Sequence, residues 1–552
     1  MLRHLIFAFL GGVAFTVLLV NAQSQSGFIS IDCGIPENSR YTDRITGIDY
    51  VSDGSFTDTG VSNNISPEYK SDKLEEQFLN VRSFPEGRKN CYTLKLDPGN
   101  SKFLIRASFM YGNYDGQGKV PRFDLLLESD PWESVEFENA SSIIYKEVIH
   151  VPQKNYIYVC LVNTGFGAPF ISALELRPLQ NSTYVARSGS LALSERLDIG
   201  STTNETFRYR DDVCDRMWWP ISFNNVTLLS GSYSYFGDKY KLPSTVMGTA
   251  IMASNGSDFL NINWETSDPE SKFYFYFHFA EVAEKQENDT REMTIYEGGD
   301  LWYGPFEPFY YSTTTVFSKS PASGKKIEFV IQKTENSTLP PILNAIEVYM
   351  EINESPQSLT YQQDVDAMMN IKKIYGVKKN WQGDPCGPKY YLWPGVNCSY
   401  DDIEAPRIIS LNLSSSGLEG KTTSYLFGLT SIQSLDLSNN SLTGSVPDFL
   451  AELPSLTLLD LTGNNLIGSV PAGLVEKQKN GLLSLSLDEN PHLCGLESCK
   501  EKKKKNKFIV PAVVASVVSV SILIIAVLCI FWNIRRRKQG TTKYHYLNYL
   551  NF

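Results

Sequence analysis

The sequence is poor in histidine and in the short motifs of common enzyme chemistries. It has 552 residues but five histidines, and those between its two long apolar segments are His150, His278 and His492. No Gly-x-Ser-x-Gly elbow and no His-Glu-x-x-His zinc motif occurs, so hydrolases of those two types are excluded. A membrane-anchored glycosidase needs only two carboxylates, and this alternative stays open.

The chain also lacks the signs of a metal site and of a nucleic-acid-binding surface. Asp49, Asp53 and Asp58 lie close together in sequence, but their spacing differs from that of an EF-hand loop. The formal net charge is −11, and no patch combines basic with aromatic residues. We therefore assign no catalytic residue, no metal, no cofactor and no nucleic-acid partner.

Charge is absent from one long stretch near the end of the chain. Phe508 to Trp532 is a run of 25 apolar or weakly polar residues. As a helix it would extend about 37 Å, enough to cross a hydrocarbon core of about 30 Å. This length predicts a single transmembrane helix over 508–532 in a lipid bilayer, with 533–552 as a short cytoplasmic tail.

The N-terminus has the pattern of a cleaved secretory signal peptide. Leu5 to Val20 is an apolar run, and Val20 and Ala22 place small residues at the −3 and −1 positions before Gln23. A retained signal anchor is the alternative. Basic residues flank the second apolar segment on both sides and do not orient it, but a long exported domain crosses regardless of charge. We predict a signal peptide over 1–22 and a single-pass type I protein of the plasma membrane, N-terminus extracellular.

Potential N-glycosylation sites agree with this orientation. Twelve Asn-x-Ser/Thr sequons lie between the two apolar segments, and none follows the second. Each sequon alone is a weak signal, but their one-sided distribution suits the secretory pathway. We predict a glycoprotein with candidate sites at Asn64, Asn139, Asn181, Asn204, Asn225, Asn255, Asn288, Asn336, Asn353, Asn397, Asn412 and Asn439.

Cysteine usage also fits an oxidising compartment. Eight of the nine cysteines precede the second apolar segment, and an even number suits disulfide bonds. Proximity in the sequence predicts the pairs Cys386–Cys398 and Cys494–Cys499. The pairing of the other four stays open, namely of Cys33, Cys91, Cys160 and Cys214.

Residues 28–352 have the pattern of β-strands. The run from Phe103 to Phe109 places Phe, Ile, Ala and Phe at alternate positions, and Phe273 to Phe279 is aromatic or histidine throughout. Period two with aromatic and β-branched side chains indicates strands. Because apolar side chains occupy both faces, we expect these strands to be buried in two-sheet sandwiches.

This region contains two copies of one unit. Pro169 to Leu176 matches Pro341 to Val348 at an offset of 172 residues, and Ile31 to Gly34 is echoed by Leu197 to Gly200. Similar order at similar spacing predicts two tandem β-sandwiches, over residues 28–190 and 191–352.

Three motifs carry a family resemblance. They are Ile31-Asp32-Cys33-Gly34, Arg82-Ser83-Phe84-Pro85-Glu86-Gly87 with Asn90-Cys91-Tyr92, and Arg106-Ala107-Ser108-Phe109 leading into Tyr111-Gly112-Asn113-Tyr114-Asp115-Gly116. Together they resemble the extracellular malectin-like region of plant receptor-like kinases. The resemblance implies that each sandwich binds a ligand through loops at one end, or that both bind it in the cleft between them. The ligand is expected to be a carbohydrate or a peptide.

Two aromatic groups are candidates for ligand contact. Tyr111, Tyr114 and Asp115 share a glycine-rich loop, and Trp302 and Tyr303 follow Gly-Gly-Asp in the second copy. A ring can pack on the apolar face of a sugar while carboxylates and amides bind its hydroxyls. The alternative is that these rings fill the ends of the sandwiches.

A helical linker and cap are predicted over residues 356–400. One face of the helix is expected to carry Val365, Met368, Met369, Lys372 and Tyr375, with Gly376 as the C-terminal stop. The Cys386–Cys398 pair around Trp393 resembles the N-terminal cap of plant leucine-rich repeats, and such a cap covers the apolar face of the first repeat.

The leucine pattern of residues 405–499 predicts a short solenoid of leucine-rich repeats. The repeats begin at Ile408, Ile432, Leu456 and Leu482, spaced by 24, 24 and 26 residues. Their leucines are expected to point inward, and an asparagine in each coil is placed to bond the backbone. The segment from Asn490 to Cys499 resembles the C-terminal cap.

The order of these parts resembles the plant family of receptor-like kinases with a malectin-like domain and leucine-rich repeats. That family normally continues into a cytoplasmic kinase, but no phosphate loop, His-Arg-Asp or Asp-Phe-Gly element follows Trp532. We expect a mainly β, non-enzymatic receptor-like protein that binds an extracellular ligand and signals through a partner or co-receptor kinase. The alternative is a truncated, non-signalling or decoy form of a receptor-like serine/threonine kinase.

Overall fold

A computed structural model of the protein describes residues 25–97, 101–186, 189–231, 238–254, 258–310, 312–352, 359–401, 403–494 and 523–535. These residues belong to two compact units. Unit 1 comprises the chain up to Val365 together with Lys378–Ile408, and unit 2 comprises Asp366–Val377 with the chain from Ile409. The predicted signal peptide, Asn255, Asn353, Cys499 and most of 508–552 lie outside the described residues.

The first half of unit 1 is a β-sandwich with an aromatic core. Phe109, Phe123 and Phe170 meet there edge to face, with ring centroids 5.7–6.3 Å apart. Its elements are β1 (Ile29–Asp32), β2 (Arg40–Thr42), β3 (Asp49–Ser52), η1 (Asp53–Ser55), β4 (Val61–Asn64), η2 (Pro67–Tyr69), η3 (Glu76–Phe78), β5 (Asn80–Ser83), β6 (Lys89–Lys95), β7 (Phe103–Met110), β8 (Arg122–Leu127), β9 (Asp130–Val135), β10 (Ile143–His150), β11 (Tyr156–Phe166), β12 (Phe170–Ile171) and β13 (Ala173–Pro178).

The second half repeats this architecture around a core of its own. Phe275 and Phe277 pack on Phe329, with ring centroids 4.8 and 5.0 Å apart. Its elements are β14 (Ser190–Asp198), β15 (Trp219–Pro220), β16 (Val226–Ser230), α2 (Ser244–Met247), β17 (Thr249–Ala253), β18 (Phe259–Glu265), β19 (Phe273–Phe279), β20 (Met293–Glu297), β21 (Asp300–Phe306), β22 (Thr314–Phe317), β23 (Lys326–Lys333), β24 (Ile342–Leu343) and β25 (Ala345–Ile352). Strands β7 and β19 are buried along their whole length, which confirms the prediction of strands covered on both faces.

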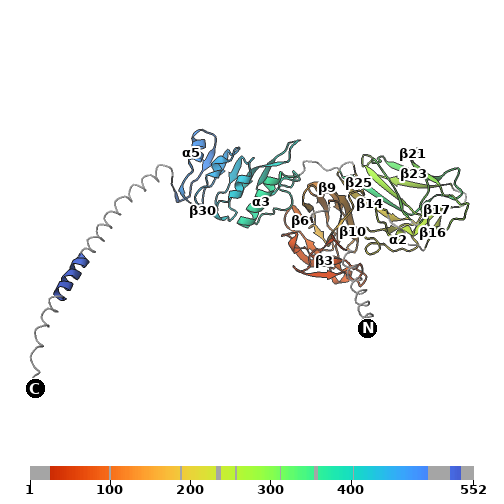
Figure 1. Cartoon of the computed structure of the whole chain (residues 1–552), viewed down its shortest axis with the longest axis horizontal. Coiled ribbons are helices and arrows are strands. Elements are labelled where there is room, and N and C mark those ends of the chain that lie inside the picture. Colours follow the sequence, from red (N-terminus) through yellow and green to blue (C-terminus); the bar gives the residue numbers. More distant parts are fainter. Residues whose placement is uncertain are drawn as a thin grey trace, which may run out of the picture. The chain divides into compact units, whose positions relative to one another are not determined.

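One sheet runs through both halves. Its strand order is β2-β3-β1-β13-β7-β10-β14-β25-β19-β22, and β10 pairs with β14 through Val148 opposite Ala192 and Ile149 opposite Leu191. Separate four-stranded sheets, β6-β11-β8-β9 and β18-β23-β20-β21, form the other layer of each half. The halves therefore lie side by side and share backbone hydrogen bonds (Figure 1), a junction that the sequence did not indicate.

The duplicated motifs take equivalent places in the two halves. Asp32 and Asp198 end β1 and β14 at the same register position of the pairs β1–β13 and β14–β25. Gly34 and Gly200 follow two residues later, and a Cβ on either would lie 2.3 Å from a backbone atom of another segment. Glycine is needed at both positions because a neighbouring backbone passes too close for any side chain.

The cap segment of unit 1 packs on the first sandwich through a buried lysine. The Lys89 ammonium donates to the backbone oxygens of Asp384, at 2.9 Å, and of Gly387, at 2.6 Å. The buried Asp384 carboxylate accepts from the backbone N–H groups of Thr360, Cys386 and Gly387 at 2.7–2.9 Å. Burial lowers the pKa of Lys89 to about 8, while the charge of Asp384 opposes that shift.

A disulfide lies directly beneath this segment. Cys91 and Cys160 join β6 to β11, and Cys386 pairs with Cys398 inside the cap. Gly383 has a φ of +64°, and a Cβ there would lie 2.6 Å from the Cys91 sulfur. The cap thus covers the disulfide so closely that only glycine fits at position 383.

Unit 2 is a solenoid of parallel strands. Strands β27 (Arg407–Asn412), β29 (Ser434–Asp436), β31 (Leu458–Asp460) and β33 (Ser484–Ser486) pair in that order on one side. A second row contains β28 (Glu419–Lys421), β30 (Ser441–Gly444), β32 (Asn465–Ser469) and β34 (His492–Cys494). The other elements of unit 2 are η4 (Ser424–Gly428), α4 (Phe449–Glu452) and α5 (Ala472–Lys479). Strand β26 (Val396–Ser399) belongs to unit 1, and α3 (Gln362–Tyr375) has residues in both units.

Asparagines link successive coils, as predicted. The Asn464 amide nitrogen donates to the backbone oxygens of Leu437 and Leu461 at 3.0 Å each, and its oxygen accepts from the Leu442 N–H at 3.0 Å. Asn440 and Asn490 repeat the arrangement in the neighbouring coils. These bonds satisfy backbone groups that the turns leave without strand partners.

Two side chains lie differently from their predicted places. Leu482 is expected to point inward but is 62% exposed, and the adjacent Leu483 is buried in its place. Met369 is 44% exposed, because the buried stripe of α3 passes through Met368 and Ile371 instead. Gly376 has a φ of +56° directly after α3, as expected of a helix-ending glycine.

Residues 523–535, which overlap the predicted span 508–532, are helical. Within the described part of the chain, no helix combines the length and the apolar character needed to cross a membrane.

We predict that replacing Lys89 loosens the cap. Lys89→Met leaves two buried carbonyl oxygens without their donor, at a cost of roughly 1–3 kcal/mol. Hydrogen–deuterium exchange of the full chain should show faster exchange at 380–387, and dithiothreitol should reduce the Cys91–Cys160 disulfide faster. Lys95→Met, an exposed lysine on the same strand, is the control. Unchanged exchange and reduction in the Lys89 variant would rule out this role.

A second prediction concerns the pH dependence of stability. Burial raises the pKa of Asp198 to about 6, although hydrogen bonds from Ser201 and Thr249 oppose the shift. Since the unfolded value is about 3.9, the stability contribution of this group is present below pH 4 and lost as the pH rises through 6. Asp198→Asn should therefore match the wild type near pH 4 and exceed it at pH 7 by about 3 kcal/mol.

Thermal unfolding of the full chain between pH 4 and pH 7 tests this expectation. Asp49→Asn, an exposed carboxylate of β3, is the matched control and should follow the wild-type profile. Parallel profiles for Asp198→Asn and the wild type would contradict the prediction.

Candidate functional site

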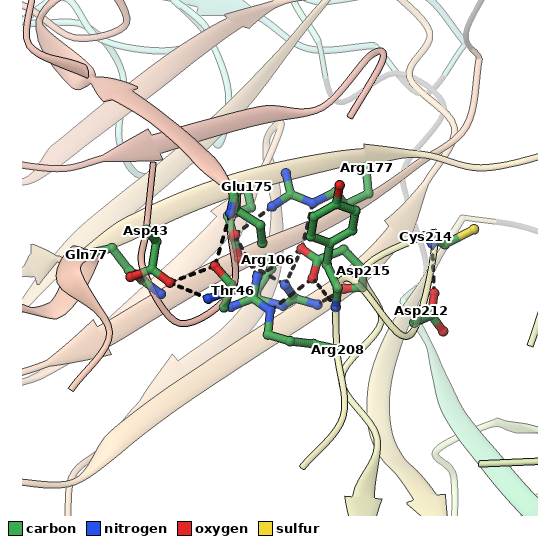
Figure 2. A network of polar contacts seen from close by, with 12 residues as sticks. Asp43, Thr46, Gln77, Arg106, Glu175, Arg177, Arg208, Asp212, Cys214 and Asp215 are labelled. Carbon is green, nitrogen blue, oxygen red and sulfur yellow. Dashed lines mark hydrogen bonds and ion pairs between the residues drawn. The ribbon is translucent and has the colours of Figure 1, made fainter. Parts of the chain in front are cut away.

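The most concentrated group of charges lies between the two halves of unit 1 and is fully buried. Asp215 accepts from the guanidinium groups of Arg106 at 3.1 Å, Arg177 at 2.7 Å and Arg208 at 2.9 Å. Glu175 accepts from the same three arginines at 2.6–3.0 Å. Figure 2 shows these side chains converging from strands of the first half and a loop of the second.

The network continues across the shared sheet. Arg106 and Arg196 both bond Glu147, at 2.8 and 2.9 Å, and Arg196 also bonds Glu347 at 2.9 Å. Four guanidinium groups thus face four carboxylates, and none of these side chains is more than 7% exposed. Trp218 packs beside them and is fully buried.

Electrostatics identifies this network as structural. Burial alone raises the pKa of Glu175, but Arg208, Arg177 and Arg106 outweigh it and hold the pKa at about 2. The same arginines hold the pKa of Asp215 well below its usual range against its burial. Perturbed pKa values often mark reactive groups, but here every charge is compensated and enclosed, so the network fixes the two halves together.

Among the described residues of unit 1, two thiols are free. Cys33 is buried in the core of the first half, and Cys214 is half-buried in a loop beside the network (Figure 2). Cys214 lines a pocket of about 390 Å³ together with Tyr184, Tyr240 and Lys239. The eight cysteines before the predicted span therefore do not all pair, because these two lie in different parts of unit 1.

The first predicted ligand group is a compact loop after β7. The Tyr111 ring is fully buried, with its centroid 5.4 Å from that of Tyr114, and its hydroxyl donates to the Asp115 carboxylate. Burial and that hydrogen bond raise the pKa of Tyr111, which keeps the hydroxyl protonated as a donor. Tyr114 is half-buried against Phe170, and Asp115 is exposed. Tyr114 and Asp115 thus face outward while Tyr111 holds the loop from inside.

The second predicted group borders an open pocket in the second half. Trp302 is half-buried on β21 and packs edge to face on Phe277 and Phe329, with centroids 5.7 and 5.2 Å away. Its pocket of about 360 Å³ falls within the usual range for ligand sites, about 300–1,000 Å³. Tyr303, the next residue on β21, is 41% exposed. The two predicted groups belong to different sandwiches.

Sequence reasoning missed the charged side chains of this pocket. Glu297, Lys326 and Glu328 line it with Asp300, and burial raises the pKa of Glu297. In the sequence, Glu297 comes directly before the two glycines and the aspartate that precede the predicted aromatic group. This Glu-Gly-Gly-Asp pattern is typical of a hairpin and could have indicated that Glu297 belongs to the same site. Lys326 and Glu328 come from β23, which only the sheet brings beside that hairpin.

Comparison with known proteins gives the family. A family model described as the malectin-like domain matches residues 31–351, and a leucine-rich repeat model matches 406–466. The chain is 50% identical over 534 residues to a putative leucine-rich repeat receptor-like protein kinase of Arabidopsis thaliana, covering 95% of this chain and 60% of that protein. It is 48% identical over 531 residues to the Arabidopsis LRR receptor-like serine/threonine-protein kinase IOS1, with coverages of 95% and 59%.

The chain belongs to the plant family of malectin-like, leucine-rich-repeat receptor-like kinases. It spans about 60% of the length of these curated relatives. Solved structures similar to its malectin-like region include the ANX2 ectodomain from Arabidopsis thaliana, with a TM-score of 0.47, 16% identity, and coverage of 59% of this chain and 97% of that one. The plant peptide RALF23 in complex with FER and LLG2 gives a TM-score of 0.46, 14% identity, and coverages of 58% and 94%.

The malectin-like region and the repeats expose their sequons. The asparagine is exposed at each of the ten sequons among the described residues: Asn64, Asn139, Asn181, Asn204, Asn225, Asn288, Asn336, Asn397, Asn412 and Asn439. A glycan at any of them would extend into solvent without displacing core residues. Glycosylation itself stays a prediction.

We predict that the malectin-like halves separate or misfold when one network carboxylate is removed. Asp215→Asn leaves three buried guanidinium groups short of negative charge, at a cost of roughly 3–5 kcal/mol. The expected result is a lower unfolding temperature and a lower secreted yield of the full chain. Glu136→Gln removes an exposed pair with Arg122, whose side chains are 60% and 56% exposed, and should change neither. Equal behaviour of the two variants would refute the structural role.

Proposed function

We propose that this protein is a cell-surface receptor-like protein whose malectin-like region binds an extracellular ligand, a carbohydrate or a peptide. Residues 508–532 anchor it in the plasma membrane as a single-pass type I protein, and it signals through a partner that carries a kinase. The curated relatives, which are receptor-like kinases by name, support this reading.

The observation that carries the proposal is the open pocket beside Trp302. It offers a half-buried ring and several carboxylates at the surface of the second sandwich, which are the groups that bind sugars and peptide side chains. Tyr114 and Asp115 offer a similar pair on the first sandwich. The RALF23 complex with FER and LLG2 is a case of peptide binding by a receptor assembly, which makes a peptide the ligand to test first.

The exposed sequons and the disulfides also support an extracellular malectin-like region. Exposure at all ten described sequons suits modification in the secretory pathway. The disulfides Cys91–Cys160 and Cys386–Cys398 are buried bonds of the kind that persist outside the cell.

A binding screen of the full chain in detergent tests the proposal. We expect at least one wall oligosaccharide or secreted peptide to bind, and Tyr114→Ala or Tyr303→Ala to weaken that binding about tenfold through loss of a ring contact. Tyr390→Ala, which removes a tyrosine that is 84% exposed on the cap, is the control.

If no oligosaccharide or peptide in the screen binds to the chain, the proposal is wrong. Once a ligand is found, co-purification of a kinase-bearing relative only in its presence supports signalling through a partner. Suppression of that relative's response by this chain would instead establish the decoy alternative.

A further inference from the structure

The pocket beside Trp302 sits at one end of the outer sheet of the second half. The sheet order β18-β23-β20-β21 leaves β21 as an edge strand, labelled with β23 in Figure 1. The turn between β20 and β21 contains Gly298 and Gly299, both with positive φ, and forms one wall of the pocket. Lys326 and Glu328 at the start of β23 also line it, and the Gly298 N–H donates to the backbone oxygen of Glu328 at 3.0 Å.

The charge inside this pocket is unbalanced. Glu328 pairs with Lys326 at 3.6 Å, which leaves the carboxylates of Glu297 and Asp300. Among the described residues, no cationic side chain lies within ion-pair distance of either. Glu297 is also partly removed from water, and its raised pKa reflects that burial without a compensating partner. A cation entering the pocket would therefore gain an attraction that the protein itself does not supply.

An apolar surface adjoins these carboxylates. The Trp302 ring packs edge to face on the core residues Phe277 and Phe329, and the part of it that is left exposed lines the pocket. Leu301, the preceding residue on the edge strand, also lines the pocket and is 64% exposed. A planar cation is the group that stacks on an indole ring and bonds carboxylates at the same time.

Two of the predicted glycosylation sites lie away from this end of the sheet. Asn288 and Asn336 lie near the opposite end, where the Thr290 hydroxyl donates to the backbone oxygen of Asn336 at 2.9 Å. Strand β23 runs from Lys326 at the pocket to Lys333, which lies opposite Met293 near those sequons. Seven residues of strand separate the two ends by about 20 Å, so glycans at these sequons start well away from the pocket.

We propose that this pocket binds the arginine side chain of an extracellular peptide. The guanidinium bonds Glu297 and Asp300 and stacks on the exposed part of Trp302, and an apolar residue beside the arginine covers Leu301, which also lines the pocket. Arginine is favoured over lysine because its planar group satisfies two carboxylates and an aromatic face together. This inference rests on the proposed function and names the ligand chemistry at its second-half site.

Binding of a short labelled peptide to the full chain tests the inference. The probe is acetyl-Gly-Leu-Arg-Leu-Gly-amide, measured by fluorescence polarisation, and its partner probe replaces arginine by citrulline, which has the same shape without the charge. We expect the arginine probe to bind about tenfold more tightly than the citrulline probe. The double variant Glu297→Gln/Asp300→Asn should remove that difference and leave citrulline binding unchanged.

A matched variant and a folding control complete the test. Glu287→Gln/Glu335→Gln removes two exposed carboxylates near the sequon end and should keep the wild-type preference. Equal unfolding temperatures show that the pocket variant is folded. If wild type binds both probes equally, or if the pocket variant keeps the preference, the arginine site is overturned.

The outcomes also separate this inference from the proposed function. Binding of another peptide or an oligosaccharide by a chain that ignores the arginine probe overturns the arginine site and leaves the receptor function standing. A chain that binds no ligand of any class overturns both.

Discussion

Four arginines and four carboxylates, enclosed between two sandwiches, are the constraint on which the malectin-like region depends. A buried charge is tolerated only while its partners stay in place, because removing one of them leaves an ion without water or counter-charge. Arg106 and Arg196 reach across the shared sheet to the same Glu147, so neither half can shift without separating paired charges. The joint is thereby fixed in one arrangement.

This rigidity decides where recognition can take place. Among the described residues, the charges of the network are paired and enclosed, so we look for binding groups where strands and loops reach the surface. Tyr114 with Asp115 and Trp302 with its acidic neighbours are such places, one on each sandwich. A buried charge also holds the cap segment in place. The Lys89 ammonium is buried and donates hydrogen bonds to two backbone oxygens of that segment.

Patterns local in sequence predicted much of this protein. The alternation in β7 and β19, the duplicated Asp-x-Gly motifs and the asparagine of each repeat all reappear in the expected roles. Predictions were less accurate for side chains whose burial depends on which face of a coil or helix each residue occupies. Leu482 and Met369 are exposed because one residue of shift on a coil or helix exchanges inside for outside.

Family, strand content and repeat count follow from the amino-acid order alone, because period, spacing and motif are properties of neighbours along the chain. The shared sheet, the Cys91–Cys160 bond and the charged pocket around Trp302 do not, because their partners lie tens to hundreds of residues apart. Such contacts arise only when distant strands are brought into register, and a single sequence carries no direct record of that pairing.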